Sequence, residues 1–321
     1  LNKFSSINVC VIGDLIIDEY IACAPLGMSQ EDPTIVVSPI NTAKFIGGAG
    51  IVSMHASSLG AKVTFLSVTG EDNERRYALG KLSSKNLTTC LAMDEKRITT
   101  LKQRFQAEGK TLLRVSHLMQ DFIDEKIQTE LMKAFDQVLD DLDLVVFSDF
   151  NYGCLPQSFV DEIIYKSKKA GKLVVADSQS SSQIGDICRY KEMNLISSTE
   201  REARISLQNS QDGLVVLAEN LRSRSKAENI FLKLGSQGVL LHIKSDEDPS
   251  ISITDQLHAL NNSPKDTAGA GDSMLITSAL GLAVGASPWE SACLGSIAAA
   301  IQVGRVGNIP LTQEDFTKIL S

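Results

Sequence analysis

The sequence predicts an α/β protein: a central, mostly parallel β-sheet covered by helices on both faces, as a three-layer sandwich, with a small second sheet. Two observations support this prediction. Short apolar runs alternate with longer helical patterns through most of the 321 residues, which is typical of repeated β–α units. Within residues 95–117 this alternation gives way to the pattern of a β-hairpin.

In the first part of the chain, apolar runs of strand length are bounded by glycines and prolines. The first run ends at Gly13-Asp14, so its carboxyl end is expected to open onto a site. A glycine-rich string at 47–50 precedes apolar residues at helical spacing, and Gly60 follows them, which predicts a packed helix. We therefore expect strands at 7–13, 35–40 and 62–68, and helices at 51–59 and 71–84.

The hairpin pattern consists of two strand-like runs, 98–105 and 111–116, on either side of Glu108-Gly109-Lys110. Together with the run at 35–40, they are expected to form the small sheet. A sheet of this kind over an active site acts as a lid that excludes water.

After residue 122 the alternation of helices and strands is steady, and its last two strands are expected to form a hairpin. The pattern predicts helices at 123–139, 157–170, 200–207 and 213–224, strands at 144–148, 173–176, 194–197, 229–234 and 238–243, and an exposed polar loop at 244–250.

Composition limits the classes of partner and of site. The net charge is −8, which disfavours wide contact with nucleic acid or an anionic membrane. No apolar run approaches the roughly 20 residues of a membrane span, and no leader is visible, so we expect a cytoplasmic protein. The six cysteines include no CxxC pair and the four histidines are far apart, so reduced cysteines and no metal site of Cys and His are expected.

Residues 265–273, Lys-Asp-Thr-Ala-Gly-Ala-Gly-Asp-Ser, precede an apolar run and predict a small-residue loop that opens a helix. The free N–H groups of a helix start form an anion site, and small residues let a ligand come close. A carboxylate there, Asp272, would repel a phosphate, unless it takes a proton from a hydroxyl that attacks a phosphoryl group. In the plainer alternative, Gly269 and Gly271 shape a turn and Asp272 caps the helix.

Residues 266–272 resemble the C-terminal signature of the ribokinase-like (PfkB-type) sugar kinases, Asp-Thr-x-Gly-Ala-Gly-Asp. The resemblance covers nearly the whole chain. It implies one ribokinase-like domain at 1–321, with lid strands inserted at about 15–45 and 95–117, and it implies a sugar kinase that uses ATP and Mg²⁺. By this resemblance Asp272 is the catalytic base, and the anion hole for the transferred phosphate consists of the backbone of Ala268, Gly269, Ala270 and Gly271.

Other candidate residues lie where ligands gather in an open parallel sheet, at the carboxyl ends of the strands. They are Asp14, Asp149, Asp177 and the turn 235–238. Asp14 and Asp18 are suited to accept hydrogen bonds from two sugar hydroxyls. The residues alone leave a second reading open, in which Asp14 caps a turn, Asp18 is solvated and 235–238 is a plain hairpin turn.

The resemblance assigns roles to most of these residues. Residues 47–48 look like the family's sugar-binding signature, and 233–238 resemble its Thr-Lys-Gly-Ser-x-Gly nucleotide loop. The implied substrate-binding residues are Asp14, Asp18, Gly47, Gly48 and Asp149. The implied nucleotide-binding residues are Lys233, Gly235, Ser236, Gly238, Thr267, Ala268 and Ser296. Glu202 matches the acid of an Asn-x-x-Glu motif that acts on Mg²⁺ indirectly, and Asp266 marks the vicinity of a monovalent cation such as K⁺.

Within the family, four strings look most like the heptose-phosphate kinase branch, which in some proteins is the first half of a bifunctional ADP-heptose synthase. The strings are Gly13-Asp14 with Asp18, 28–33, 148–150 and 303–307. Because little sequence follows the last of them, we expect the kinase half alone in these 321 residues.

Five positions depart from the resembled pattern. Ile51 stands where the family has an Asn that contacts the sugar, and Thr199 replaces the Asn of Asn-x-x-Glu. The lysines expected in the heptose branch near Thr100, Tyr152 and Gln179 are absent, and an uncharged side chain cannot replace a lysine that faces a phosphate. Either the substrate differs, or activity is weak, or other cations substitute, such as Lys102, Arg104 or Arg114.

A sugar kinase with a heptose-phosphate-like substrate is therefore the leading hypothesis. A non-catalytic sugar- or nucleotide-binding protein on the same scaffold is the alternative, although the retained Asp272 speaks against it. A dinucleotide-dependent oxidoreductase is disfavoured because Ser53 stands where GxGxxG requires its third glycine, and no GxxxxGK[ST] string of a Walker-type NTPase occurs. Because lids of the resembled family often pair, a homodimer through the lid is expected.

Overall fold

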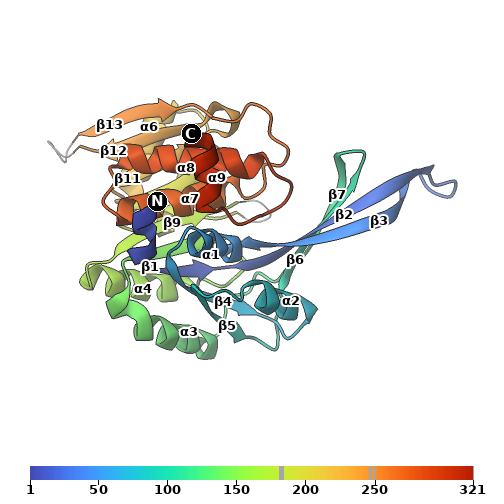
Figure 1. Ribbon diagram of the computed structural model, residues 1–321, viewed down its shortest axis with the longest axis horizontal. Helices are drawn as coiled ribbons and strands as arrows, with labels where there is room; N and C mark the ends of the chain where they lie inside the picture. The colour runs from blue at the N-terminus through green and yellow to red at the C-terminus, as the bar shows by residue number, and fades with distance from the viewer. Residues whose placement is uncertain (181–183, 246–247, 249–250, 321) are drawn as a thin grey trace.

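A nine-stranded sheet forms the middle layer of the computed structural model, which describes residues 1–180, 184–245, 248 and 251–320 (Figure 1). Its order is β13-β12-β11-β10-β9-β8-β1-β4-β5, parallel from β11 to β5 and antiparallel at β12 and β13. The strands are β1 (Asn8–Gly13), β4 (Lys62–Thr69), β5 (Leu87–Met93), β8 (Leu144–Asp149), β9 (Leu173–Ser178), β10 (Leu195–Thr199), β11 (Asn229–Lys233), β12 (Val239–Lys244) and β13 (Ser252–Leu257).

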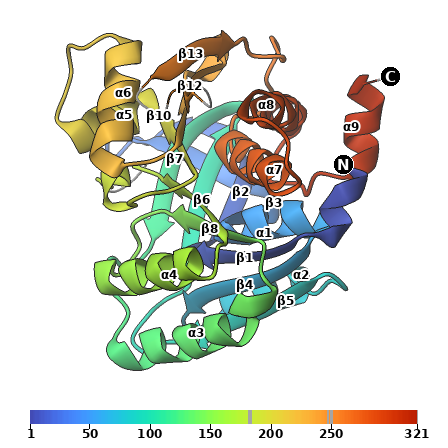
Figure 2. The same ribbon diagram turned by 90° about the vertical axis from the view of Figure 1, so that its left-hand side faces the viewer.

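Helices cover both faces of this sheet, as the three-layer prediction requires (Figure 2). One face carries α1 (Ala49–Ser58), α7 (Ala270–Ala283) and α8 (Pro288–Val303). The opposite face carries α3 (Glu125–Val138), α4 (Gln157–Lys169), α5 (Glu200–Leu207) and α6 (Leu214–Ser225). The short helix α2 (Asn73–Lys81) lies near β5, and α9 (Gln313–Leu320) lies against α8 on the outer side of that layer.

Strand β1 shows how the sheet separates two cores. Val9 and Val11 belong to the core under α1 and α7, whereas Cys10 and Ile12 belong to the core under α3 and α4. This division follows from the period of two in a strand, which sends successive side chains to opposite faces. A strand with both faces buried is expected to read as a continuous apolar run, and β1 does.

A second, four-stranded sheet extends away from the main sheet (Figure 1). Its order is β3-β2-β6-β7, with β2 (Leu15–Met28), β3 (Ile35–Gly48), β6 (Thr100–Ala107) and β7 (Lys110–His117). Strand β2 pairs antiparallel with β3 and parallel with β6. We call these four strands the lid sheet, after the role that the sequence analysis predicts for them.

The predicted strands and helices are confirmed, with shifts at their ends. The strand expected at 35–40 continues as β3 to Gly48, so the glycine pair ends a strand and Gly48 caps α1. The helix expected at 71–84 is confined to α2, which Asp72 begins by accepting from the amide of Arg75. The hairpin of β11 and β12 is antiparallel, as expected.

Several elements were not expected from the sequence: β5, β13, α8 and α9. The sequence does contain a start signal for helix α8, because Ser287 and Glu290 have the spacing of a capping box and form one in the structure. Strand β13 pairs with β12 alone and has a half-exposed pattern, which gives a weaker signal.

Three further expectations concern a loop, the cysteines and membrane spans. Of the loop expected at 244–250, Lys244 ends β12, Ser245 is buried, and 246–247 and 249–250 lie outside the described residues. All six cysteines are free thiols, and four of them are buried. Across the described ranges, no helix is both long and apolar enough to cross a membrane.

Candidate active site

A cavity of about 840 Å³ lies between the carboxyl end of the main sheet, the start of α7 and the lid sheet. Many predicted site residues line it: Asp18, Gly48, Glu202, Lys233, Gly235, Ser236, Gly238, Thr267, Ala268, Gly269, Ala270, Gly271, Asp272 and Ser296. Four others, all of them described, are not part of its wall: Asp14, Gly47, Asp149 and Asp266. The catalytic and nucleotide positions are therefore brought together, and the substrate positions only in part.

The start of α7 has the geometry of an anion site. Gly269 is the N-cap with φ 75, and a Cβ there would lie 2.3 Å from Oδ1 of Asn308, so the position requires glycine. The first amides of the helix border the cavity and have no partners within the helix itself, although that of Ala270 makes a long contact of 3.5 Å with the carbonyl of Thr267. The amide of Ala268 instead donates to Oδ1 of Asp266 at 3.0 Å, so its part in the anion hole stays a prediction.

Asp272 lies in the first turn of α7, is 6% exposed and lines the cavity. Gln179, just beyond β9, donates from Nε2 to Oδ1 of Asp272 at 3.0 Å. Burial and the charge of Asp177 raise the pKa of Asp272 to about 7. A carboxyl group with a pKa near neutrality is suited to take a proton from an alcohol in a water-poor cavity.

Lys233, at the end of β11, forms an ion pair with Asp177 of β9, with 2.6 Å between Nζ and Oδ2. Burial raises the pKa of Asp177 to about 6, although Lys233 opposes the shift. Burial alone would lower the pKa of Lys233, but the charges of Asp177 and Glu202 outweigh it and raise that pKa. An ammonium group is thereby kept charged beside the start of α7.

The lid sheet supplies the opposite wall, which is rich in cations: Lys102 and Arg104 of β6 and Arg114 of β7. Nζ of Lys102 lies 5.2 Å from the ring centre of Phe150 and 5.0 Å from that of Tyr152, in cation–π contact. Among the described residues, neither Lys102 nor Arg114 forms an ion pair with a carboxylate. Both cations are thus available to an anionic ligand.

Asp18 is part of β2 and is 6% exposed, so the reading in which it is solvated is wrong. Its Oδ1 lies 3.5 Å from Nη2 of Arg104, and its Oδ2 accepts from Nδ2 of Asn308 at 3.1 Å. Burial raises the pKa of Asp18, and Arg104 and Lys102 oppose this shift. A Cβ on Gly47 would lie 2.4 Å from Oδ2 of Asp18, so Gly47 makes room for this carboxylate.

Asp14 holds the turn that follows β8. Its Oδ2 accepts from the amides of Phe150 at 2.8 Å and Tyr152 at 3.3 Å, and its Oδ1 accepts from Cys154 at 3.3 Å. Three amides occupy the carboxylate, and the residue is 4% exposed. These contacts favour a structural role, and direct binding of the sugar by Asp14 stays a prediction.

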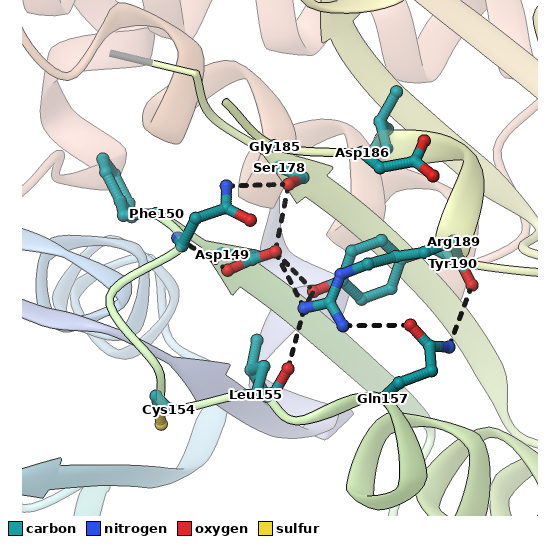
Figure 3. Close-up of polar contacts among 12 residues, drawn as sticks. Asp149, Phe150, Cys154, Leu155, Gln157, Ser178, Gly185, Asp186, Arg189 and Tyr190 are labelled. Carbon is teal, nitrogen blue, oxygen red and sulfur yellow. Dashed lines mark hydrogen bonds and ion pairs between the residues drawn. The ribbon is translucent and has the colours of Figure 1, made fainter. Parts of the chain in front are cut away.

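Asp149 lies in a buried polar cluster and is not part of the cavity wall (Figure 3). Its Oδ2 accepts from Ser178 at 3.0 Å, Arg189 at 3.0 Å and Tyr190 at 2.9 Å. Figure 3 shows Arg189 bridging Asp149 to Leu155 and Gln157. Because these contacts saturate one carboxylate oxygen in the interior, they favour a structural role, and substrate contact by Asp149 stays a prediction.

Thr199 and Glu202 form a capping box at the start of α5. Glu202 accepts from the amide of Thr199 at 2.7 Å, and Thr199 accepts from that of Glu202 at 3.2 Å. The second oxygen of Glu202 accepts from the amide of Ser180 at 3.1 Å. Thr199 therefore serves as an N-cap, as an Asn does. The replacement of Asn by Thr in the family motif leaves Glu202 at the cavity wall.

Two other expected positions lie outside the cavity wall. Asp266 accepts from the hydroxyl of Tyr20 at 2.7 Å and from the amide of Gly307 at 3.0 Å, besides that of Ala268. Its link to a monovalent cation stays a prediction. Ile51 is fully buried in the core under α1, so the side chain that replaces the family's Asn packs apolar neighbours.

Sequence reasoning did not find two polar residues from the end of the chain. Asn308 reaches Asp18 across 290 positions of sequence. Gln302 of α8 donates to the carbonyls of Gly307 at 2.9 Å and Ala268 at 3.3 Å, which fixes the loop before α7. The nearby string 303–307 had been matched to the family, but no local pattern marks an isolated Asn or Gln as part of a site.

Comparison with known proteins agrees with this geometry. Residues 6–315 match the profile of the pfkB family carbohydrate kinases. The bifunctional protein HldE of Desulfatibacillum aliphaticivorans is 32% identical over 98% of this chain and 63% of its own length. The HldE of Campylobacter fetus is 31% identical over 94% of this chain and 64% of its own length. The chain thus spans a little under two thirds of these relatives.

Solved structures share the fold at lower identity. Phosphofructokinase-2 from Escherichia coli in complex with potassium has a TM-score of 0.76 at 17% identity, covering 98% of this chain and 97% of that one. Arabidopsis thaliana ribokinase complexed with ribose and ATP has a TM-score of 0.73 at 17% identity, covering 98% of both chains. The match along nearly the whole sequence and the ribokinase-like fold place this chain in the pfkB family of carbohydrate kinases, which are phosphotransferases with an alcohol group as acceptor.

Proposed function

We propose that this chain transfers the γ-phosphoryl group of ATP to a hydroxyl group of a phosphorylated sugar. The observation that carries the proposal is the position of Asp272, whose carboxyl group stands at the start of α7 and faces the cavity. A base and a set of backbone amides in one water-poor site are what phosphoryl transfer to an alcohol requires. Because ATP is drawn from the cytoplasm, we place the chain there.

In this mechanism Asp272 accepts the proton of the sugar hydroxyl as its oxygen attacks the γ-phosphorus. The bond between that phosphorus and the bridging oxygen of ADP breaks, and ADP leaves. The amides of Ala270 and Gly271 hold the charge on the transferring group. Asp18, across the cavity, is positioned to accept from other hydroxyls of the sugar and so to orient the attacking one.

Mg²⁺ is expected to arrive with ATP. It would neutralise negative charge on the phosphates. Glu202 is the acidic residue suited to act on it through water, because both its carboxylate oxygens already accept backbone amides. K⁺ near Asp266 is also part of the proposal, although internal donors engage both oxygens of that side chain.

The cations of the lid sheet support a phosphorylated substrate. Lys102, Arg104 and Arg114 lie on the cavity wall opposite the nucleotide loop, and Lys102 contacts Tyr152, where the heptose branch is expected to carry a lysine. Three cations on one wall suit a phosphate group on the far end of a sugar. Together with the HldE relatives, this favours a heptose phosphate or a similar sugar phosphate.

The test is a panel of acceptors with MgATP, in which ADP release is measured. The panel contains a heptose 7-phosphate, fructose 6-phosphate and the unphosphorylated sugars of both. Faster ADP release with the phosphorylated member of each pair supports the proposal. Binding of a sugar phosphate without ADP release would favour the alternative, a non-catalytic binding protein, and preference for unphosphorylated sugars would contradict the substrate class.

We also propose that two copies pair through the lid sheet. The sheet exposes apolar side chains that nothing in the described chain covers, among them Ile35, Ile40 and Leu113, which are 58%, 71% and 56% exposed. Exposed apolar patches of this kind are typical of surfaces that bind another protein. Pairing would bury them and hold the lid sheets over both cavities.

A further inference from the structure

Lys233 stands where the resembled nucleotide loop begins with a threonine, and Leu234 stands where that loop has its lysine. The lysine is therefore shifted by one position, and at position 233 it lines the cavity. Conversely, Gln179 stands where the heptose branch is expected to have a lysine. The two residues are neighbours in space, because Lys233 binds Asp177 and Gln179 follows Asp177 by two positions. Compared with the resembled patterns, a positive charge is missing after β9, and one stands at the end of β11, two strands away in the sheet.

The ammonium group of Lys233 lies against the start of α7. A Cβ built on Gly271 would be 3.2 Å from Nζ and 3.8 Å from both Cδ and Cε of Lys233. The amide edge of the anion site and this ammonium group are therefore adjacent, and the absence of a side chain on Gly271 leaves room between them. A side chain at this position would require a small shift of the Lys233 ammonium group.

Lys233 has donors left for a ligand. Within the described part of the chain its one hydrogen-bond partner is Asp177, at 2.6 Å, and an ammonium group carries three donors. Its side chain is 11% exposed and lines the cavity. The ion pair with Asp177 fixes the position of Nζ, so a phosphoryl group held by the α7 amides would meet a preorganised cation.

Gln179 does not compete for this role. Its amide is uncharged, and its Nε2 donates to Asp272. Besides burial, Asp177 and Asp18 raise the pKa of Asp272, and Lys233 and Lys102 oppose them. Of these two lysines, Lys102 belongs to the lid sheet and Lys233 ends β11, on the nucleotide side of the cavity.

We propose that Lys233 is a catalytic residue that contacts the γ-phosphoryl group and stabilises its charge during transfer, in place of a lysine at position 179. The inference rests on the proposed kinase function and deepens it. It assigns no bond-breaking step to Lys233, which keeps its protons and acts by charge and hydrogen bonding.

The test separates contact with phosphate from the structural pairing with Asp177. Lys233→Met alone leaves Asp177 buried and unpaired, so the decisive variant is Lys233→Met with Asp177→Asn, which removes both charges. Asp177→Asn alone is the matched control. Thermal unfolding checks that each variant folds.

We expect the double variant to lower kcat about 100-fold with the best acceptor, as loss of one preorganised donor does in other enzymes, while KM for the acceptor stays within threefold. A second readout needs no turnover: calorimetric titration with Mg²⁺ and either ADP or the non-hydrolysable analogue AMP-PNP. The double variant should lose about tenfold in affinity for AMP-PNP and less than twofold for ADP.

Equal affinity changes for AMP-PNP and ADP, or none, would overturn the inference, as would a kcat that recovers in the double variant. These outcomes differ from failure of the proposed function. If no acceptor elicits ADP from the wild-type protein, the kinase proposal fails, and the AMP-PNP and ADP titrations still decide whether Lys233 contacts the γ-phosphate.

Discussion

Gln179 and Asp272 are joined by a hydrogen bond of 3.0 Å between Nε2 and Oδ1, across the carboxyl end of the main sheet. Burial and Asp177 raise the pKa of Asp272 to about 7, although Lys233 opposes the shift. A hydrogen-bond donor to a carboxylate favours its ionised form. The contact orients the proposed base, and we expect it to favour the ionised form.

A pH profile tests this relationship. Because Asp272 must be ionised to accept a proton, kcat/KM should rise with pH through about 7 and level off above it. Gln179→Leu removes the donor, so the midpoint of the rise should move to higher pH, with about a tenfold loss of activity at pH 7. Gln106→Leu, on the lid sheet and outside the cavity wall, is the control. An unshifted midpoint in Gln179→Leu would show that the contact does not act on the base.

The pKa of Asp272 also predicts a stability effect. A carboxyl group whose pKa is raised in the folded state binds its proton more tightly there than in the unfolded chain. The free energy of unfolding therefore falls as pH rises from about 4 to about 7. Asp272→Asn lacks this titration, so its unfolding free energy should exceed that of the wild type at pH 8 and approach it at pH 4. Chemical denaturation at both pH values measures the difference, and a variant less stable at pH 8 would contradict the burial of an ionisable base.

We expect the cations of the lid sheet to contribute to binding of the sugar phosphate and not to binding of ATP. Arg114→Ala and Lys102→Ala should each raise KM for a sugar phosphate about tenfold or more, because a charge-assisted contact with phosphate is lost. KM for ATP should stay unchanged. Lys110→Ala on the same hairpin, outside the cavity wall, is the matched control. An equal rise in KM for phosphorylated and unphosphorylated acceptors would show that these cations do not contact the phosphate group.

The cluster around Asp149 is expected to carry stability. Tyr190→Phe removes one of the donors to Oδ2 and leaves the ring packed against Phe147. The free energy of unfolding should fall by about 1–3 kcal/mol, the usual cost of an unmet buried hydrogen bond. Activity at low temperature, where the variant is folded, should keep its KM for the acceptor. A large rise in that KM would indicate that Asp149 contacts the substrate and would contradict a purely structural role.

The proposed pairing of lid sheets is tested by Leu113→Asp combined with Ile40→Asp. Both side chains are exposed in the single chain, so the variant should fold normally. Light scattering with size-exclusion chromatography should find two copies for the wild type and one for the variant. A wild type that is monomeric at all concentrations would exclude the pairing.

Much of the fold could be predicted because its signals are local. Buried strands such as β1 and β8 read as short apolar runs, and glycines mark the ends of the helix α1. The start of α7 was predictable for the same reason, since amides, small residues and Asp272 are contiguous in sequence. Strand β2 was harder to predict from the sequence, because polar residues interrupt its apolar pattern. Its pairing with β3 also contains two bulges near Pro25.

The contacts that complete the site are not local. Asn308 meets Asp18, and Lys233 meets Asp177, only after the sheet is assembled. The ends of the predicted strands place Asp14 and Asp149 at the carboxyl edge of the sheet, where the site lies. The sequence does not show that donors from the protein itself occupy their carboxylate oxygens. Which carboxylates face a cavity depends on side-chain direction and packing, and these are set by the whole fold.

The most direct test of the account is the turnover of Asp272→Asn with the best acceptor of the panel. Asn keeps the shape of the side chain but cannot accept the proton, so kcat should fall by at least about 1,000-fold, while calorimetry finds ATP bound as in the wild type. Turnover within tenfold of the wild type would show that Asp272 is not the base and that phosphoryl transfer at this site proceeds in another way.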